Sequence, residues 1–322
     1  MEAVQLTAHG EPDVLTVNEI DRPTPTANEV LVKVGAAGVN PVDTKFRSGE
    51  YTPVDLPFTP GVDVAGEVID QGDACSSFEP GDRVFGTGIG STSHQGAYAE
   101  FATVPEDRLV KIPPSVDTVT AGAAGVVAAT AWRALFDHAG LQLGENCLIH
   151  GGSGGVGHVG VQLAAAAGAT VVTTAAPRFH DRIQESFGAS VVLDYDHSML
   201  ADAITEAADG GIDVILDHRC DAYLQLDATV AATGARIVGI GEASSNAGFD
   251  PLSAVRAKDL SYTFMSLFNS PDLRIPLQAI ADRLEAGGLD IAVERTYSLD
   301  EAAAAHRDIK NESFCGKLVI VP

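Results

Sequence analysis

The sequence predicts an α/β protein in which a doubly wound parallel sheet is inserted into a smaller, β-rich domain. Two observations carry this prediction. From residue 144 to about residue 265, short apolar runs typical of buried strands alternate with Ala-, Asp- and Glu-rich segments that suit helices. On both sides of this region, short strand-like runs are punctuated by proline and glycine. We therefore expect the β-rich domain to be built from both ends of the chain.

The first 120 residues contain short apolar or alternating runs at 3–6, 14–20, 29–36, 62–69, 83–85 and 98–104. This pattern is expected for a small barrel or sandwich. Residues 118–138 then have the apolar spacing of a helix. In the central region we expect six strands, at 147–150, 170–174, 190–194, 212–216, 235–240 and 260–265. Six short strands with intervening helices describe a complete doubly wound sheet.

After Pro271 we expect a helix at 273–286, a strand near 291–297, a helix at 300–309 and a final strand at 317–321. These elements divide the chain into a β-rich domain, residues 1–122 and 268–322, and a central domain, residues 123–267.

A glycine cluster at 151–157, GGSGGVG, links the first central strand to the helix that follows. It fits the pattern G-x-G-x-x-G between a strand and a helix, the order that a dinucleotide-binding unit requires. Glycines permit a tight turn close to a pyrophosphate, and the helix N-terminus offers unpaired N–H groups. The alternative, a flexible glycine linker, does not explain the flanking buried strand and alanine-rich helix. The expected cofactor-binding residues here are Gly152, Ser153, Gly154, Gly155, Val156 and Gly157.

The chain is strongly acidic: 44 Asp and Glu against 20 Lys and Arg give a net charge of −24, although 45% of the residues are hydrophobic. This composition excludes a disordered acidic tail and disfavours nucleic acid and anionic membranes as partners. An acidic surface suits concentrated salt, because charges are screened over about 3 Å at 1 M. We therefore expect a halophilic protein, whose melting temperature rises with KCl concentration.

Neither the N-terminal sequence nor the cysteine pattern indicates a location outside the cytoplasm. The first residues lack the basic, then apolar, pattern of a signal peptide, and we expect no apolar run long enough to span a bilayer. The four cysteines form no C-x-x-C pair and suggest neither a disulfide framework nor a cysteine-rich zinc lobe. Cytoplasmic localisation is the simplest prediction.

Seven segments spread from end to end of the chain carry a family resemblance. They are GVNPVDTKFRSGEY (38–51), LPFTPGVDVAGEV (56–68), GDRVFG (81–86), GAYAEF (96–101), TAWRALFDHAG (130–140), GGSGGVGHVGVQLA (151–164) and GKLVIVP (316–322). Together they resemble the zinc-independent quinone oxidoreductase branch, which includes zeta-crystallin, of the medium-chain dehydrogenase/reductase superfamily. The resemblance implies a GroES-like catalytic domain with a Rossmann domain, two-electron reduction with NAD(P)H and, commonly, homodimers.

The resemblance also separates this chain from the zinc alcohol dehydrogenases of the superfamily. Those enzymes carry a ligand cysteine at the position of Asn40 and a His-Glu pair at the positions of Val62 and Asp63. Zinc favours thiolate and imidazole ligands, and neither is present at these positions. We therefore expect no catalytic zinc.

The cofactor preference depends on the end of the second central strand. NAD-specific sites usually place an acid there to bind the ribose 2′-hydroxyl. Here the strand ends at Thr174 with no acid before Asp181, whereas Arg178 suits a bidentate contact with a 2′-phosphate. The family resemblance adds Tyr195 after the third strand. We favour NADPH over NADH; the alternatives are a solvent-exposed Arg178 at a helix start and a simple loop aromatic at Tyr195.

The resemblance places Asn40 in the active cleft and Thr130 beside the nicotinamide. The Asn40 amide offers both a donor and an acceptor to a carbonyl oxygen. Tyr51 is a candidate proton donor, because a phenol with a pKa of about 10 is protonated at neutral pH. The alternatives are a turn residue before a proline for Asn40, a helix N-cap for Thr130, and a core or rim position for Tyr51.

Further cofactor candidates are Gly239 and Ile240 at the end of the fifth strand, Ser266, Leu267 and Phe268 in the segment near the sixth, and Lys317 in the terminal GKLVIVP segment. The alternatives are an edge strand with a packing or dimer role at 264–268 and a plain strand-start lysine at Lys317. Among the histidines, His94 is assigned to a mobile loop, 86–96, over the site. Packing or solvent contact explains His150 and His158, which flank the glycine loop.

The leading functional hypothesis is hydride transfer from NADPH to a small-molecule quinone or an α,β-unsaturated carbonyl. The cofactor carries the chemistry, and the protein orients the reacting carbons and excludes water. The first alternative is reduction of a 2-enoyl thioester or a small alkenal, although this acidic chain offers few basic residues for CoA phosphates. The second is a cofactor-binding protein with little turnover.

Overall fold

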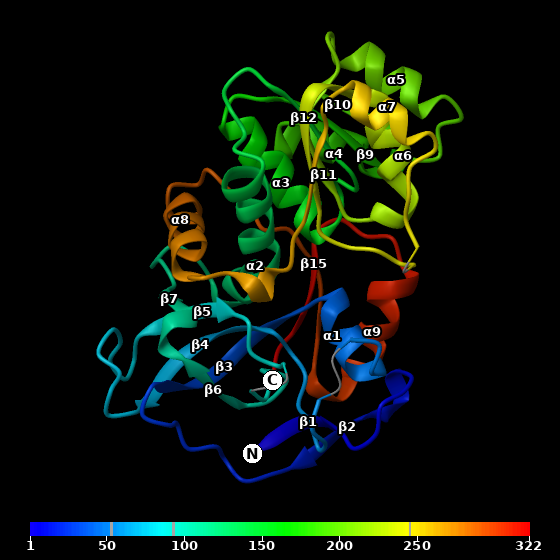
Figure 1. Cartoon of the computed structure of the whole chain (residues 1–322). Helices are drawn as coiled ribbons and strands as arrows, with labels where there is room; N and C mark the ends of the chain where they lie inside the picture. The colour runs from blue at the N-terminus through cyan, green and yellow to red at the C-terminus, as the bar shows by residue number, and fades with distance from the viewer. Residues whose placement is uncertain (52–53, 92–93, 245) are drawn as a thin grey trace. The chain divides into compact units, whose positions relative to one another are not determined.

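The computed structural model describes residues 1–51, 54–91, 94–244 and 246–322, which form two compact units (Figure 1). Unit 1 consists of Met1–Ala129 and Ser270–Pro322, and unit 2 is Thr130–Asn269. Unit 2 is thus inserted into the chain of unit 1. The predicted boundaries at 122/123 and 267/268 stay a prediction about separately folding domains.

Unit 1 contains a small antiparallel pair, β1 (Glu2–Leu6) with β2 (Leu15–Glu19), and a seven-stranded sheet. The larger sheet has the order β14-β15-β3-β4-β5-β7, and β6 pairs with β3 off this path. Only β14 and β15 pair in parallel among its described strands. These strands are β3 (Glu29–Val39), β4 (Asp63–Gln71), β5 (Arg83–Thr87), β6 (Phe101–Pro105), β7 (Leu109–Lys111), β14 (Val293–Tyr297) and β15 (Lys317–Ile320).

The eleven residues of β3 are enough to pair with three strands. β6 lies along 29–33, β4 along 30–36 and β15 along 37–39. Val30, Val32 and Val34 of β3 are buried in the core of unit 1, as the alternation along a strand requires. Leu318 of β15 lies opposite Val39, so the C-terminal strand passes beside the residue that follows β3.

The helices of unit 1 include one that the sequence prediction missed. Besides the longer helix at Thr118–Trp132, they are α1 (Pro41–Ser48), α8 (Arg274–Glu285) and α9 (Ala302–Asn311), with short 3-10 helices at Pro12–Val14, Glu106–Arg108 and Leu299–Glu301. The missed helix, α1, begins at a proline and ends at Gly49, which has a left-handed φ of 79°. Its eight residues give too few turns for a clear apolar period. The three-residue β7 was missed for the same reason.

Helix α2 (Thr118–Trp132) continues as a π-helical segment, Arg133–His138, so the predicted helix at 118–138 is confirmed. Contrary to the expectation that no run is long enough, Thr118–His138 is long and apolar enough to cross a membrane. However, 72% of the most apolar 18-residue stretch of this helix is buried inside the protein. A core helix satisfies the same length and composition criteria, so this stretch is weak evidence of a membrane span.

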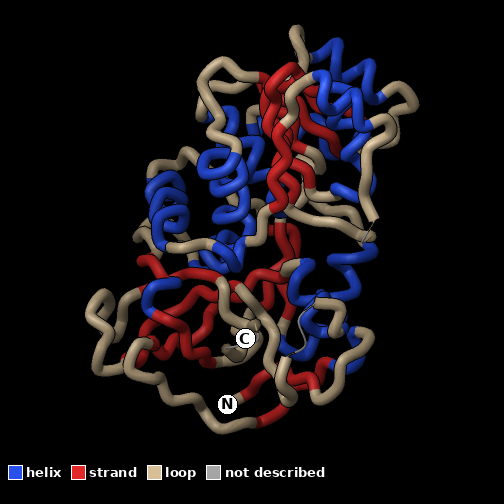
Figure 2. Tube along the Cα trace, viewed as in Figure 1, coloured by secondary structure: helices blue, strands red, loops and turns tan. Residues whose placement is uncertain are grey.

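Unit 2 contains a six-stranded parallel sheet with the order β10-β9-β8-β11-β12-β13, flanked by helices (Figure 2). Its strands are β8 (Asn146–Ile149), β9 (Thr170–Ala175), β10 (Val191–Asp194), β11 (Ile212–Asp217), β12 (Ala231–Gly239) and β13 (Ser261–Phe264). Its helices are α3 (Gly155–Ala166), α4 (His180–Phe187), α5 (Leu200–Ala207), α6 (Cys220–Val230) and α7 (Leu252–Ala257), with 3-10 helices at Pro177–Phe179 and Leu267–Asn269.

This strand order is that of a Rossmann sheet, in which the first strand lies in the middle and ligands bind beyond the carboxyl ends of the strands. All six predicted strands are present within a few residues of their predicted limits. The predicted α/β class with a doubly wound parallel sheet is therefore confirmed.

Candidate functional site

The glycine loop of unit 2 lies between the end of β8 and the start of α3. Gly151 has a φ of +69°, which disfavours any residue with a side chain. A Cβ added to Gly152 would collide with the Thr173 hydroxyl, and one added to Gly157 would collide with the carbonyl oxygen of Gly151. The loop is therefore packed so closely against itself and β9 that only glycine fits at these positions.

The base of the loop is fixed by β9, and its helical end is available to a ligand. The Gly151 N–H donates to Thr174 Oγ1 at 3.0 Å, and the Gly152 N–H donates to the Thr174 carbonyl at 2.8 Å. Helix α3 has Gly154 as its N-cap and no side-chain cap, so its first N–H groups have no helical partner. These N–H groups and the helix dipole fit a phosphate.

Four other predicted cofactor residues follow the carboxyl ends of the strands. Ala175 of β9 lies opposite Asp194 of β10, so Arg178 and Tyr195 come just after two neighbouring strand ends. Both are exposed, Tyr195 by 41%. The Arg178 guanidinium lies 4.7 Å from the centre of the Phe179 ring. Gly239 ends β12, and the Ile240 N–H donates to the carbonyl of Asp217, which ends β11.

The segment after β13 is joined to its neighbours by backbone groups. The Met265 N–H donates to the Gly239 carbonyl at 2.8 Å, and the Ser266 carbonyl accepts from Arg133 Nη1 at 3.0 Å. Leu267 is buried, whereas Phe268 is 36% exposed. Thr130 is buried within the last turn of α2, so its alternative interpretation as a helix N-cap is wrong.

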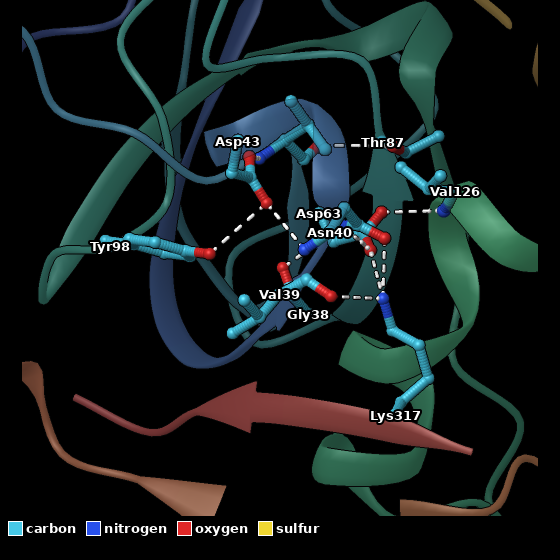
Figure 3. A network of polar contacts seen from close by, with 10 residues as sticks. Gly38, Val39, Asn40, Asp43, Asp63, Thr87, Tyr98, Val126 and Lys317 are labelled. Atoms are coloured by element: carbon cyan, nitrogen blue, oxygen red, sulfur yellow. Dashed lines mark hydrogen bonds and ion pairs between the residues drawn. The ribbon is translucent and has the colours of Figure 1, made fainter. Parts of the chain in front are cut away.

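In unit 1, Asn40 lies at the centre of a buried polar network (Figure 3). Its Nδ2 donates to Asp63 Oδ2 at 2.8 Å and to the Gly38 carbonyl at 3.2 Å. Its Oδ1 accepts from Lys317 Nζ at 2.6 Å. Both amide hydrogens of Asn40 are thus used within the network, which leaves only acceptor capacity at Oδ1.

Lys317 is 3% exposed and comes from β15, at the opposite end of the chain from Asn40. Its Nζ also donates to the Val39 carbonyl at 2.7 Å and lies 3.9 Å from Asp63 Oδ2. Asp63 Oδ1 accepts from the Val126 N–H at 2.7 Å. Burial lowers the pKa of Lys317 and raises the pKa of Asp63, and the attraction between the two groups opposes both shifts. Each charge therefore depends on the other to remain ionised.

Asp43, in the first turn of α1, connects the network to the core. Its carboxylate accepts from the Asn40 N–H at 2.8 Å, the Val62 N–H at 3.0 Å and the Tyr98 hydroxyl at 3.2 Å. Burial, reinforced by the charge of Asp63, raises the pKa of Asp43 to about 7. Burial also holds the pKa of Tyr98 well above its usual value, which keeps its hydroxyl a donor.

Tyr51 lies just beyond α1 and is 40% exposed. Its ring packs edge-on against Phe46, with the ring centres 5.4 Å apart, so its position combines packing with access to solvent. His94 Nε2 lies 3.6 Å from Glu29 Oε1. Residues 92–93 of the predicted mobile loop lie outside the described residues, so that loop stays a prediction.

Sequence reasoning did not assign functional positions to Asp43 and Tyr98, and it treated Asp63 only as an absent zinc ligand. A signal for both carboxylates is nevertheless present. Asp43 stands three residues after Asn40, where a helix N-terminus accepts a capping side chain, and Asp63 interrupts an otherwise apolar strand. A buried carboxylate requires a partner, but the sequence does not say that the partner is Lys317.

His306 of α9 packs edge-on against Tyr98 and provides a test of the burial in this region. It is 0% exposed, and burial lowers its pKa from 6.5 to about 3, with the charges of Arg47 and Lys310 acting in the same direction. The unfolded chain takes up a proton near pH 6.5 and the folded chain does not. The contribution of neutral His306 to stability is therefore lost as the pH falls below about 6.5.

We expect His306→Leu to remove this acid sensitivity. Between pH 7 and pH 5 the wild type should lose about 2 kcal/mol relative to the variant, since each pKa unit corresponds to about 1.4 kcal/mol. Urea unfolding at both pH values measures the difference. His197→Gln, at an exposed histidine, is the control and should follow the wild type. A stability difference between the wild type and His306→Leu that does not change with pH would contradict the prediction.

Two family models match separate stretches of the chain. Residues 26–114 match the alcohol dehydrogenase GroES-like domain, and residues 187–320 match the zinc-binding dehydrogenase family. The quinone oxidoreductase of Rattus norvegicus is 36% identical over 329 residues, covering 100% of this chain and 98% of the rat protein.

Two solved structures, each covered completely and covering the whole chain, extend the comparison. An NAD-dependent alcohol dehydrogenase has a TM-score of 0.94 and 27% identity. The quinone oxidoreductase of Escherichia coli, solved in complex with NADPH, has a TM-score of 0.91 and 24% identity, which shows a shared fold. The GroES-like and Rossmann architecture expected from the sequence is confirmed. The full-length identity to the rat protein shows that the chain belongs to the quinone oxidoreductase family of the medium-chain dehydrogenase/reductase superfamily.

Proposed function

We propose that this protein is an NADPH-dependent, zinc-independent oxidoreductase that transfers hydride to a quinone or an α,β-unsaturated carbonyl. The observation that carries the proposal is the glycine loop, where side chains are excluded at Gly152 and Gly157 beside an uncapped helix N-terminus. The name of the rat relative supports a quinone as the substrate. Its identity over nearly its whole length argues that the same activity is retained here.

The residues of the chain have separate roles in this proposal. The N–H groups at the start of α3 bind the pyrophosphate, and Arg178 and Tyr195 bind the 2′-phosphate. Residues after the later strands, Gly239, Ile240, Ser266, Leu267 and Phe268, contact the rest of the cofactor, with Lys317 as a further candidate. When bound, the cofactor supplies a hydride. Asn40, Tyr51 and Thr130 orient the substrate and the nicotinamide, and Tyr51 or water protonates the product.

The chemistry of the Asn40 network supports the absence of catalytic zinc. Asn40 Oδ1 and the Val39 carbonyl are already occupied by the Lys317 ammonium, and Val62 offers no ligand atom. A divalent cation beside that ammonium would be repelled, and hard oxygen donors without thiolate or imidazole suit zinc poorly. Metal analysis of the purified protein should find less than about 0.1 zinc per chain, and one tightly held zinc would contradict the proposal.

A steady-state panel tests the activity. Purified protein is assayed in high salt with NADPH and NADH against quinones, enones, small alkenals and enoyl-CoA. The proposal expects the largest kcat/KM with NADPH and a quinone or an enone. Preference for enoyl-CoA or small alkenals would favour the enoyl thioester/alkenal alternative. Tight NADPH binding without oxidation by any acceptor would favour a cofactor-binding protein.

Arg178→Gln tests the proposed preference for NADPH. A charge-assisted contact to the 2′-phosphate contributes about 1.5–3 kcal/mol, so the KM for NADPH should rise by about 10- to 100-fold. The KM for NADH, which lacks this phosphate, should change less than about twofold. Arg182→Gln, at an exposed arginine on α4, is the matched control. Equal changes for both cofactors would reject Arg178 as the specificity residue.

Tyr51→Phe tests the proton donor while retaining the ring that packs against Phe46. Because water can protonate the product, we expect an incomplete loss of activity, within the range of about 10²- to 10⁴-fold associated with general acids or below it. The solvent isotope effect and the pH profile of kcat measure the change. Complete loss in a folded variant would make Tyr51 indispensable.

We also propose a cytoplasmic homodimer adapted to high salt. The net charge of −24 supports the salt adaptation, because self-repulsion is screened as ionic strength rises. Melting temperature against KCl concentration and light scattering test salt adaptation and oligomeric state separately.

A further inference from the structure

A cluster of titratable side chains lies next to the glycine loop in unit 2. None of its members has a role in the hydride transfer proposed above. His150, the residue before Gly151, places Nε2 2.8 Å from Asp227 Oδ1, and both side chains are fully buried. Asp217 lies close enough to Asp227 for the charge of Asp227 to raise the pKa of Asp217. Asp217 Oδ1 accepts from the Arg219 N–H at 2.7 Å. These groups form one buried cluster from the glycine loop to α6 and the end of β11.

Aromatic rings pack against the same cluster of side chains. The His150 ring stacks on Tyr223, with the ring centres 4.3 Å apart and the planes 11° apart. Tyr223 and Asp227 are four residues apart on α6 and therefore lie on one face of that helix. The His218 ring lies beside Tyr223, with the ring centres 6.2 Å apart, and a Cβ on Gly151 would come 2.7 Å from its Cε1. The side chain before the loop and the first glycine of the loop are both held in place.

Two neighbouring buried carboxyl groups avoid mutual repulsion when one of them carries a proton. Asp217 Oδ2 and Asp227 Oδ2 have no hydrogen-bond partner among the described residues. Burial raises the pKa of Asp217 to about 6 and that of Asp227 well above its usual value, while burial lowers the pKa of His150 to about 4. At neutral pH the proton therefore lies on Asp227 and His150 is neutral. The bond between His150 Nε2 and Asp227 Oδ1 then joins a neutral imidazole to a neutral carboxylic acid.

We propose that His150 is a positioning residue for the pyrophosphate of the cofactor, held by a proton-sharing pair of carboxyl groups, Asp227 and Asp217. The ring cannot turn without breaking its hydrogen bond to a fully buried carboxyl group, and its backbone continues directly into Gly151. Fixing His150 therefore fixes the turn from which the N–H groups of α3 meet the phosphates. This inference rests on the proposed binding of NADPH and adds the residues that set the affinity of the loop.

Substitution of Asp227 by asparagine or by leucine tests whether the hydrogen bond to His150 is required. Asparagine matches the protonated acid, because it is uncharged and keeps a hydrogen-bonding group opposite His150 Nε2. Leucine has a similar size and makes no hydrogen bond. NADPH binding is measured by fluorescence titration, and adenosine 2′-monophosphate, which lacks the pyrophosphate, is measured by calorimetry. Asp213→Asn is the matched control, because Asp213 accepts from the Asn146 N–H at the opposite end of β8.

We expect Asp227→Leu to raise the Kd for NADPH at least about tenfold, the equivalent of 1.4 kcal/mol. The Kd for adenosine 2′-monophosphate and kcat at saturating NADPH should change less than about twofold. Asp227→Asn and Asp213→Asn should stay within about twofold of the wild type for both ligands. If Asp227→Leu does not fold, His150→Phe, which keeps the stacked ring and loses the hydrogen bond, should show the same selective loss of NADPH affinity.

Three results would overturn the inference. The first is an unchanged Kd for NADPH in Asp227→Leu and His150→Phe. The second is an equal loss of affinity for NADPH and adenosine 2′-monophosphate, which indicates general loosening of the fold. The third is Asp227→Asn binding as weakly as Asp227→Leu, which indicates an ionised pair in place of a shared proton. Failure of the proposed function is distinguishable, because the wild type itself would then not bind NADPH.

Discussion

Gly157→Ala should weaken NADPH binding at least about 100-fold, which corresponds to about 2.7 kcal/mol. The added Cβ would collide with the carbonyl oxygen of Gly151. That oxygen belongs to the backbone and also accepts from the Gly154 N–H at 2.9 Å, so it cannot move aside as a side chain would. The loop must instead change its path, which displaces the N–H groups at the start of α3. Fluorescence titration with NADPH measures the loss.

Gly160→Ala is the matched control, since Gly160 lies on the same helix less than one turn further on. Its Cβ would meet only side-chain methyl groups, at 3.3 Å from Leu216 and 3.4 Å from Ile149. Alanine is favoured over glycine inside a helix by about 0.5–1 kcal/mol, which offsets the tight contact. NADPH affinity should stay within about threefold of the wild type. If Gly157→Ala and Gly160→Ala have the same affinity for NADPH, close packing at Gly157 does not govern cofactor binding.

Lys317→Met is expected to reduce the free energy of unfolding by about 3–5 kcal/mol. Methionine fills much of the same volume but leaves the fully buried Asp63 without its cationic partner. It also removes the donor to the Val39 carbonyl and to Asn40 Oδ1. Urea unfolding of the full chain, monitored by the fluorescence of its one tryptophan and by circular dichroism, measures the change.

Two further variants separate burial from charge. Lys111→Met removes an exposed pair with Asp82, at 2.8 Å in the same unit, and should cost at most about 1 kcal/mol. Adding Asp63→Asn to Lys317→Met should recover part of the stability, because it removes the unpaired buried charge. A loss below about 1 kcal/mol in Lys317→Met, or no recovery in the double variant, would contradict a charged pair at this site.

The alternation of strands and helices between residues 144 and 265 was sufficient to predict the sheet of unit 2. Buried parallel strands are apolar along their whole length, as Cys147, Leu148 and Ile149 show in β8. Short elements were less predictable, because α1 and β7 contain too few residues to show a period. The glycine loop was also predictable, since its steric demands are local and depend on neighbours within a few residues.

The buried clusters could not be predicted, because their members are distant in sequence. Lys317 meets Asn40 only because β15 pairs with β3, and His150 meets Asp227 only because α6 packs against β11, the neighbour of β8 in the sheet. The sequence alone suggested packing or solvent contact for His150 and left Lys317 as a cofactor candidate or a plain strand-start lysine. Which buried group carries a proton depends on the local dielectric and on partners brought together by the fold.

By itself, the sequence determined the α/β class, the order of the strands in unit 2, the glycine loop and the family resemblance. These features depend on residue period and on local steric limits. The tertiary structure decided which carboxyl groups are buried and which side chains neutralise them. It placed Lys317 between Val39, Asn40 and Asp63, and it joined His150 to the carboxyl pair of Asp217 and Asp227. Long-range pairing, which no local pattern records, produces both arrangements.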